Sequence, residues 1–284
     1  MSPRVNAIKV GLRRGWTEFV LSLRSPQDQG FYVFVGVATL GYLFIRRNAE
    51  IEGTTLSLPV LAMPSILGAL VVFGLVIGPA YALAVEREDG TLLRAKAVPH
   101  GMVGYVSGQV LFQSAQVVPM FAVILVPGVL LFPGLGERLA AGWPTALWVL
   151  ALGMLAALPI GMIIGSLVPS AQKVGTWGML PVVTLAGISG IFSPIQQLWG
   201  WVQVVAQVFP MHWVGLGMRS ALLPDAAAAA ELGATWRTGL TVAVLAAWAV
   251  VGVLATPVVL RHMARRQSGA AVAQARESAA QWVR

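Results

Sequence analysis

The segment from residue 86 to residue 99, EREDGTLLRAKAVP, places charged side chains between two long apolar stretches. It opens with four consecutive charges, at Glu86, Arg87, Glu88 and Asp89. Carboxylate and guanidinium groups form strong charge-assisted hydrogen bonds. The segment therefore predicts a polar connector with side chains suited to contact another protein.

The residues after these charges predict a short helix. Gly90 permits a sharp turn, and Thr91 is a favourable capping residue. Leu92 and the four residues after it favour a helix, which Pro99 then ends. A helix held between two membrane helices could pass the movement of a cytosolic partner to both of them. The alternative is a solvated connector whose charges only stop the preceding span.

No pattern in the chain indicates catalysis or the binding of a metal or nucleotide. The sequence has no G-x-x-x-x-G-K-[ST] phosphate loop, no H-E-x-x-H motif and no cysteine. Its three histidines, His100, His212 and His262, are scattered along the chain. We therefore predict no catalytic residue, no metal site and no cofactor bound by this chain.

The composition indicates an integral membrane protein. Of the 284 residues, 57% are hydrophobic and 11% are charged, whereas a soluble domain has roughly 25% charged residues. A spanning helix needs about 20 mainly apolar residues. Six segments qualify and predict an all-α membrane fold: 27–46, 58–85, 101–132, 145–168, 174–192 and 239–260. Ser25, Pro26 and Asp28 suit the start of the first helix.

The distribution of lysine and arginine predicts the orientation. Fourteen of the 19 basic residues lie in the N-terminus, the 86–99 loop, the loop around Lys173 and the C-terminus. Positive charge concentrates on the cytoplasmic side, so both termini are predicted to be cytoplasmic. This accounts for the net charge of +8 without nucleic-acid binding, which becomes the weaker explanation.

The carboxylates bear on the energy source. None of the eleven acidic residues lies in the middle of a predicted span, whereas proton- or cation-coupled carriers usually need a charge within the membrane. A proton- or cation-coupled carrier is therefore disfavoured. If the protein transports a compound, the energy is expected to come from a partner protein, and the transported compound is expected to be hydrophobic or amphipathic.

The N-terminal segment 5–24 predicts a basic amphipathic helix. Its apolar residues recur at helical spacing beside Lys9, Arg13 and Arg14, with Trp16 on the apolar side. Such a helix next to a membrane is expected to lie in the interface. A soluble helix packed on a partner is the alternative.

Three further segments follow the fifth span. Residues 193–238 begin with an apolar stretch that either dips into the membrane or lies at the interface on its tryptophans. Residues 224–232 predict a short surface helix without chemistry. The tail, 261–284, opens with a basic cluster that we interpret as an anchor on anionic lipid.

Two motifs resemble those of type-2 ABC transporter permeases, which include daunorubicin-type drug exporters and exporters of polysaccharides or lipid-linked glycans. EREDGTLLRAKAVP is similar to the ERE-x-GTL-x-x-x-x-x-x-P segment after their second span. The late segment is similar to their second motif at Gly190, Phe192, Pro194, Trp201 and Pro210. Trp199 stands near the place where the family has a further proline.

The resemblance implies that 86–99 is a coupling helix that docks into a separate ATP-binding subunit. Its coupling residues would be Glu86, Arg87, Glu88, Gly90, Thr91, Leu92 and Pro99. Two permease subunits, either two copies or two paralogues, would sit above two ATPase copies that hold the ATP and Mg²⁺.

The resemblance also implies short re-entrant outer helices in 193–210, with an outer gate formed by Phe192, Pro194, Trp199, Trp201 and Pro210. Lys9, Arg13, Arg14 and Trp16 would lie at the inner leaflet and control lateral access from the lipid. We thus expect a single permease domain of an ATP-driven exporter in a bacterial plasma membrane. The alternatives are a channel or proton-coupled carrier, and a membrane scaffold that transports nothing.

Overall fold

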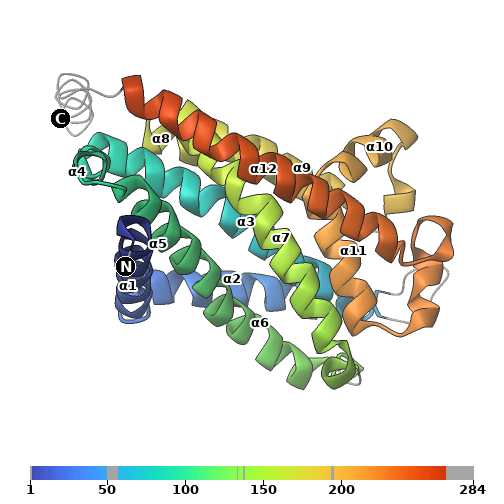
Figure 1. Cartoon of the computed structure of the whole chain (residues 1–284). Helices are drawn as coiled ribbons and strands as arrows, with labels where there is room; N and C mark the ends of the chain where they lie inside the picture. Colours follow the sequence, from blue (N-terminus) through green and yellow to red (C-terminus); the bar gives the residue numbers. More distant parts are fainter. Residues whose placement is uncertain (1, 50–56, 133, 137, 193–194, 267–284) are drawn as a thin grey trace.

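The computed structural model describes residues 2–49, 57–132, 134–136, 138–192 and 195–266. This part of the chain is helical and contains no β-strand, which confirms the all-α prediction. Five of its helical segments are long and apolar enough to cross a membrane. Figure 1 shows them side by side, with α1 and α4 at one end and α10 and α11 toward the other.

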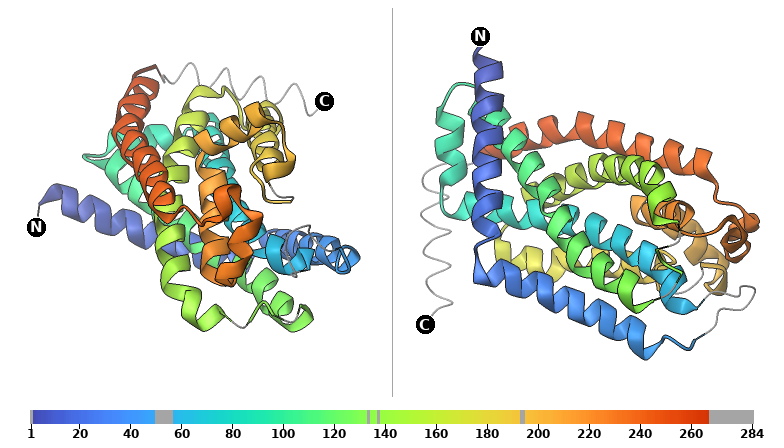
Figure 2. Two further views of the ribbon diagram at one scale, coloured as in Figure 1. Left: turned by 90° about the vertical axis from the view of Figure 1, so that its right-hand side faces the viewer. Right: turned by 90° about the horizontal axis from the view of Figure 1, so that it is seen from below.

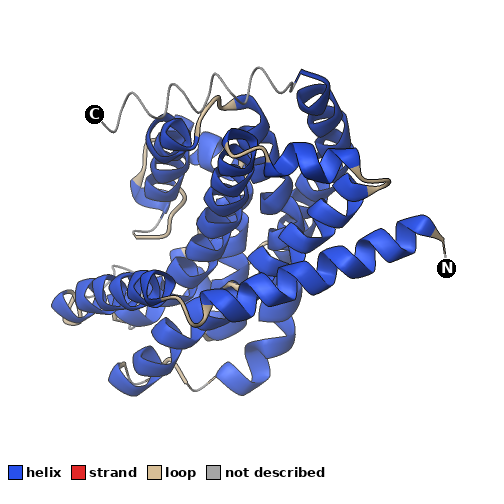
Figure 3. Ribbon diagram, turned by 90° about the vertical axis from the view of Figure 1, so that its left-hand side faces the viewer, coloured by secondary structure: helices blue, strands red, loops and turns tan. Residues whose placement is uncertain are grey.

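The first two helices begin at Ser-Pro pairs. Helix α1 is Pro3–Ser22, capped by Ser2, and α2 is Pro26–Ile45, where the Ser25 hydroxyl accepts from the Asp28 N–H at 3.3 Å. The predicted start of α2 is thus confirmed. Figures 2 and 3 show α1 lying across the spanning helices; its place at the membrane surface stays a prediction.

Helix α3, Leu58–Glu88, lies at the centre of the fold. In its most apolar 18-residue stretch 78% of residues are buried, against 17% in α2. It packs against α7, Leu139–Leu167, and α7 packs in turn against α12, Thr238–Arg266. A Cβ on Gly161 of α7 would lie 2.4 Å from the Val76 carbonyl oxygen of α3, so the two backbones touch. Small residues allow such close contact between membrane helices.

The third predicted span is divided in two. Helix α5, Gly101–Ala115, and α6, Val117–Leu131, meet at Gln116. Pro119 has no N–H for the carbonyl of Ala115 and its ring crowds that carbonyl, which explains the break at this point.

The fifth predicted span, 174–192, is not among the five long helices. It consists of α8, Ala171–Lys173, a wide π-helical turn, Val174–Gly178, and α9, Met179–Ile188. This run of helical residues is about 27 Å long at 1.5 Å per residue, slightly less than a bilayer core of about 30 Å.

The segment after α9 contains the most deeply buried short helix. A 3-10 turn at Ile195–Gln197 leads to α10, Gly200–Val208, and then to α11, Pro210–Leu222. Twelve of the thirteen residues of α11 are buried, and the helix packs against α3 and α7. The buried helix α11 therefore starts at the last residue of the predicted 193–210 segment. Pro210 is suited to this first helical position.

The short helix predicted at 224–232 is present as a 3-10 helix, but it is partly buried and not a plain surface helix. Two 3-10 turns, Asp225–Ala230 and Leu232–Ala234, occupy this region. Ala227 and Ala230 of the first turn and Glu231 between the two turns are buried, because Glu231 pairs with Arg219 of α11 and the alanines join the hydrophobic core.

Candidate functional site

Helix α4, Thr91–Ala97, connects α3 to α5 and contacts both of them. Gly90 precedes it with a φ of 80°, a conformation that favours glycine. The Asp89 Oδ1 accepts from the Thr91 N–H at 2.7 Å. The capping group is therefore Asp89 and not Thr91 as predicted, because the turn at Gly90 brings the Asp89 carboxylate over the free N–H groups of the helix start.

Glu86, at the end of α3, is bonded to the N-terminal helix. Arg14 Nη2 lies 2.9 Å from Glu86 Oε1, and Arg14 Nε lies 2.6 Å from Glu18 Oε1. The Glu86 side chain is only 13% exposed. Arg14, which the family resemblance places at the inner leaflet, is directed toward α3 and joins α1 to it.

The next two charges join α3 to the connection between α7 and α8. Arg87 Nη1 donates to the carbonyls of Gly165, Ser166 and Val168 at 3.0, 3.3 and 3.0 Å. A cation is favourable at the carboxyl end of a helix. Glu88 Oε1 accepts from the Ala171 N–H at 2.9 Å, at the start of α8.

The four charges therefore serve a junction inside the chain, which we call the charged junction: Glu86, Arg87, Glu88 and Asp89 with Arg14 and the ends of α7 and α8. Of the other predicted coupling residues, Leu92 is buried and Pro99 is exposed. The exposed part of the connector is formed by Asp89, Arg94 and residues 96–100. Val98 is an apolar side chain that is 60% exposed there.

Helix α1 is also fixed by direct backbone contact with α5. A Cβ on Gly15 would lie 2.3 Å from the Gly108 carbonyl oxygen, and one on Gly104 would lie 2.8 Å from that of Ala7. Both helices carry a G-x-x-x-G pattern, GLRRG and GYVSG, which sequence reasoning missed and could have found. On the rest of α1, Lys9, Arg13 and Trp16 are exposed.

The structure places the described outer-gate residues in separate contacts. Phe192 makes an edge contact with Tyr42 of α2, with ring centroids 6.1 Å apart. Trp199 and Trp201 pack on each other and are 74% and 66% exposed. Pro210 is buried at the start of α11, and Pro194 lies outside the described residues.

A buried ion pair near α11 was not predicted. Arg219 Nε lies 2.5 Å from Glu231 Oε1, and Arg219 Nη2 donates to Glu231 Oε2 at 3.1 Å. Their side chains are 2% and 7% exposed. Arg219 Nη1 also donates to the hydroxyl of Ser65 in α3 and to the Gly190 carbonyl. The pair thus joins α11 to α3, to the end of α9 and to the turn after α11.

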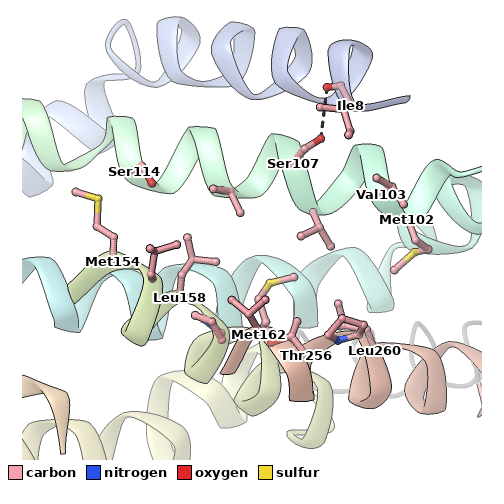
Figure 4. A pocket seen from close by; sticks show the side chains of 16 residues that line it. Ile8, Met102, Val103, Ser107, Ser114, Met154, Leu158, Met162, Thr256 and Leu260 are labelled. Atoms are coloured by element: carbon pink, nitrogen blue, oxygen red, sulfur yellow. Dashed lines mark hydrogen bonds between the residues drawn. The ribbon is translucent and has the colours of Figure 1, made fainter. Parts of the chain in front are cut away.

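Cavities lie among the described helices. One, of about 590 Å³, lies between α1, α5, α7 and α12 and has no charged lining residue among those described. Figure 4 shows Met154, Met162 and Leu260 lining it and the Ser107 hydroxyl bonded to the Ile8 carbonyl at 3.4 Å. Another, of about 440 Å³, lies between α2, α3, α5 and α6 and includes Asp28. In the described residues no cluster of metal-ligand side chains is found.

The Arg14–Glu86 contact leads to a testable prediction. Glu86→Lys places a second cation against Arg14 and is expected to lower the free energy of unfolding by about 1–2 kcal/mol, between the values for surface and buried pairs. The apparent melting temperature in detergent measures it. Glu18→Lys, which loses a more exposed i,i+4 pair, is the control, with an expected loss of about 0.5 kcal/mol. Equal losses in the two variants would show that Glu86 does not hold α1.

A comparison with known protein families identifies the family of this chain. No curated protein matches the chain. The family model described as ABC-2 type transporter matches residues 15–223, a range that runs from α1 through α11 and contains the charged junction. That match covers well over half of the sequence. The chain is therefore a multi-pass membrane protein that belongs to the ABC-2 type transporter family, as a permease subunit of an ABC transporter.

Proposed function

We propose that the chain forms the translocation path of an ATP-driven exporter for hydrophobic or amphipathic compounds. The energy would come from a separate ATP-binding subunit, present in two copies that hold ATP and Mg²⁺. The second half of the translocation path would be formed by another copy or a paralogue of this chain. The basic end, with α1, α4 and α8, would face the cytoplasm of a bacterial cell. The observation that carries the proposal is α4, a helix in contact with α3 and α5 and partly exposed at that end.

Movement of α4 would reach several helices at once through the charged junction. Asp89 fixes the start of α4, Glu86 holds α1, and Arg87 holds the end of α7. A displacement of this end would therefore shift α3 together with α1 and α7. Packed helices of this kind move as rigid bodies between discrete arrangements.

The partner contact is assigned to the exposed part of the connector, because the acidic pair is already bonded within the chain. Arg94, Val98 and Pro99 would meet the ATP-binding subunit, while Glu86 and Glu88 keep α4 in position. In this proposal Glu86 and Glu88 do not contact the ATP-binding subunit themselves. They support α4, which makes that contact.

The apolar cavity in Figure 4 supports a hydrophobic cargo or a lipid chain, since its described lining has no charged group. The buried pair Arg219–Glu231 gives little support to proton coupling. Both carboxylate oxygens of Glu231 accept from Arg219, whereas a proton relay needs a carboxylate that can exchange its proton.

Arg94→Glu tests the proposed partner contact. We expect it to reduce co-purification with the ATP-binding subunit and ATP-dependent efflux from reconstituted vesicles about tenfold, because one charge reversal at an interface costs on the order of 1–2 kcal/mol. The melting temperature of the isolated chain should stay unchanged. Arg24→Glu, an exposed reversal in the α1–α2 connection, is the matched control and should leave both measurements unchanged. Full binding and efflux in Arg94→Glu would contradict the assignment.

A further inference from the structure

The cavity between α2, α3, α5 and α6 differs from the one in Figure 4 by its polar groups. Its volume is about 440 Å³, within the range of small-molecule sites. Apolar residues of α3 and α6 form most of the wall, and Asp28, Gln113 and Gln116 also line it. A mainly apolar cavity with a few convergent polar groups is the usual form of a ligand site.

Gln113 is the first of these groups. It is 8% exposed, and within the described residues its side-chain amide has no hydrogen-bond partner. A Cβ on Gly78 would lie 2.6 Å from Gln113 Oε1, so the glycine in α3 leaves the space that the amide occupies. Its amide atoms are not fully enclosed, so a ligand in the cavity can reach them and supply a hydrogen-bond partner.

Gln116 presents a second unused acceptor. Its Nε2 donates to the Ser22 hydroxyl at 2.9 Å, which fixes the side chain between α1 and the α5–α6 break. Its Oε1 is buried and has no partner. Because this oxygen is fully enclosed, Gln116 helps to shape the wall, and Gln113 is the amide that a ligand with N–H or O–H groups can reach.

Asp28 supplies a negative charge at the end of the cavity nearest α1. Its carboxylate makes no ion pair in the described part of the chain, and the residue is partly buried. Aromatic rings of Phe31, Tyr32 and Phe73 line the same cavity. Carboxylates and aromatic faces both attract cations. The cavity lining on α2 extends from Asp28 to Val35, about 10 Å along the helix, which leaves room for an apolar body beside the charged end.

We propose that this cavity binds a lipophilic amine, with its positively charged end at Asp28, an N–H group bonded to Gln113, and the apolar body against α3 and α6. The proposal deepens the proposed export function by naming a substrate class, and it rests on that function for its physiological meaning. Binding itself needs only the isolated chain.

Fluorescence anisotropy of rhodamine 6G, a lipophilic cation, with the purified full chain tests the proposal. Asp28→Asn removes the charge at constant shape and is expected to weaken binding at least tenfold, because a charge-assisted hydrogen bond contributes more than a neutral one. Asp28→Glu should bind within about threefold of the unchanged chain. Gln113→Leu should weaken binding about five- to tenfold, the value of one hydrogen bond.

Two controls make the result specific. Thr256→Val alters the cavity in Figure 4 and should leave the affinity for rhodamine 6G unchanged. The neutral probe N-phenyl-1-naphthylamine should bind the Asp28→Asn variant as well as it binds the unchanged chain. Unchanged rhodamine binding in Asp28→Asn, or an equal loss in Thr256→Val, would overturn the proposal.

The assay also separates this inference from the proposed function. If rhodamine 6G fails to bind while the chain still joins an ATP-binding subunit and supports efflux, the amine site is wrong and the exporter assignment stands. If binding depends on Asp28 but no ATP-binding subunit associates, the cavity assignment stands and the export proposal is wrong.

Discussion

Replacing Arg219 with methionine is expected to lower the free energy of unfolding by about 3–5 kcal/mol, the usual cost of removing one partner of a buried ion pair. The substitution leaves the carboxylate of Glu231, 7% exposed in its side chain, without its cation. It also removes the bonds from Arg219 to Ser65 and Gly190. The apparent melting temperature in detergent should fall by roughly 10 °C.

A second arginine in the same region provides the matched control. Arg138 lies 3.3 Å from Asp225, and their side chains are 38% and 83% exposed. Arg138→Met should cost at most about 1 kcal/mol, as exposed pairs do. The double variant Arg219→Met with Glu231→Leu should regain part of the loss, because no unpaired charge remains buried. Equal effects of Arg219→Met and Arg138→Met would contradict the role given to burial.

Replacing Gly15 with leucine is expected to detach α1 from α5. Its Cβ would lie 2.3 Å from the Gly108 carbonyl oxygen, and because this neighbour is backbone the two helices must separate. Overpacking of this kind costs about 1–3 kcal/mol or more. Since α1 is also bonded to Glu86 in the charged junction, we expect ATP-dependent efflux to fall at least tenfold.

Cross-linking measures the position of α1 directly, since the chain has no natural cysteine. Ile8→Cys with Ser107→Cys places thiols on facing residues of α1 and α5, and a short bismaleimide should join them. Adding Gly15→Leu should lower the yield several-fold. Gly30→Leu is the control, because a Cβ at Gly30 has no neighbour within 4 Å. An unchanged yield with Gly15→Leu would show that the contact does not hold α1.

Features determined by neighbouring residues could be predicted from the sequence. Long apolar runs indicate α3, α7 and α12, because a helix that bonds its own backbone is the stable form in lipid. The Ser25–Pro26 start of α2 follows from local capping chemistry. The charges around 86–99 and the family resemblance together indicated the ABC-2 type transporter assignment, which the family match confirms.

Features determined by distant residues could not be predicted in this way. Glu86 and Arg87 are typical of a solvated connector, yet their partners lie 72 and 78 residues away, and only the packing of α1 and α7 brings them there. Glu231 is typical of a surface segment, but Arg219 and the fold of α11 bury it. Sequence by itself determined that the long apolar segments are membrane helices, because hydrogen bonding and hydropathy act locally. Tertiary structure decided which charged side chains are buried. A charge is buried only where the packing brings the end of another helix against it, and that end can lie far away in the sequence.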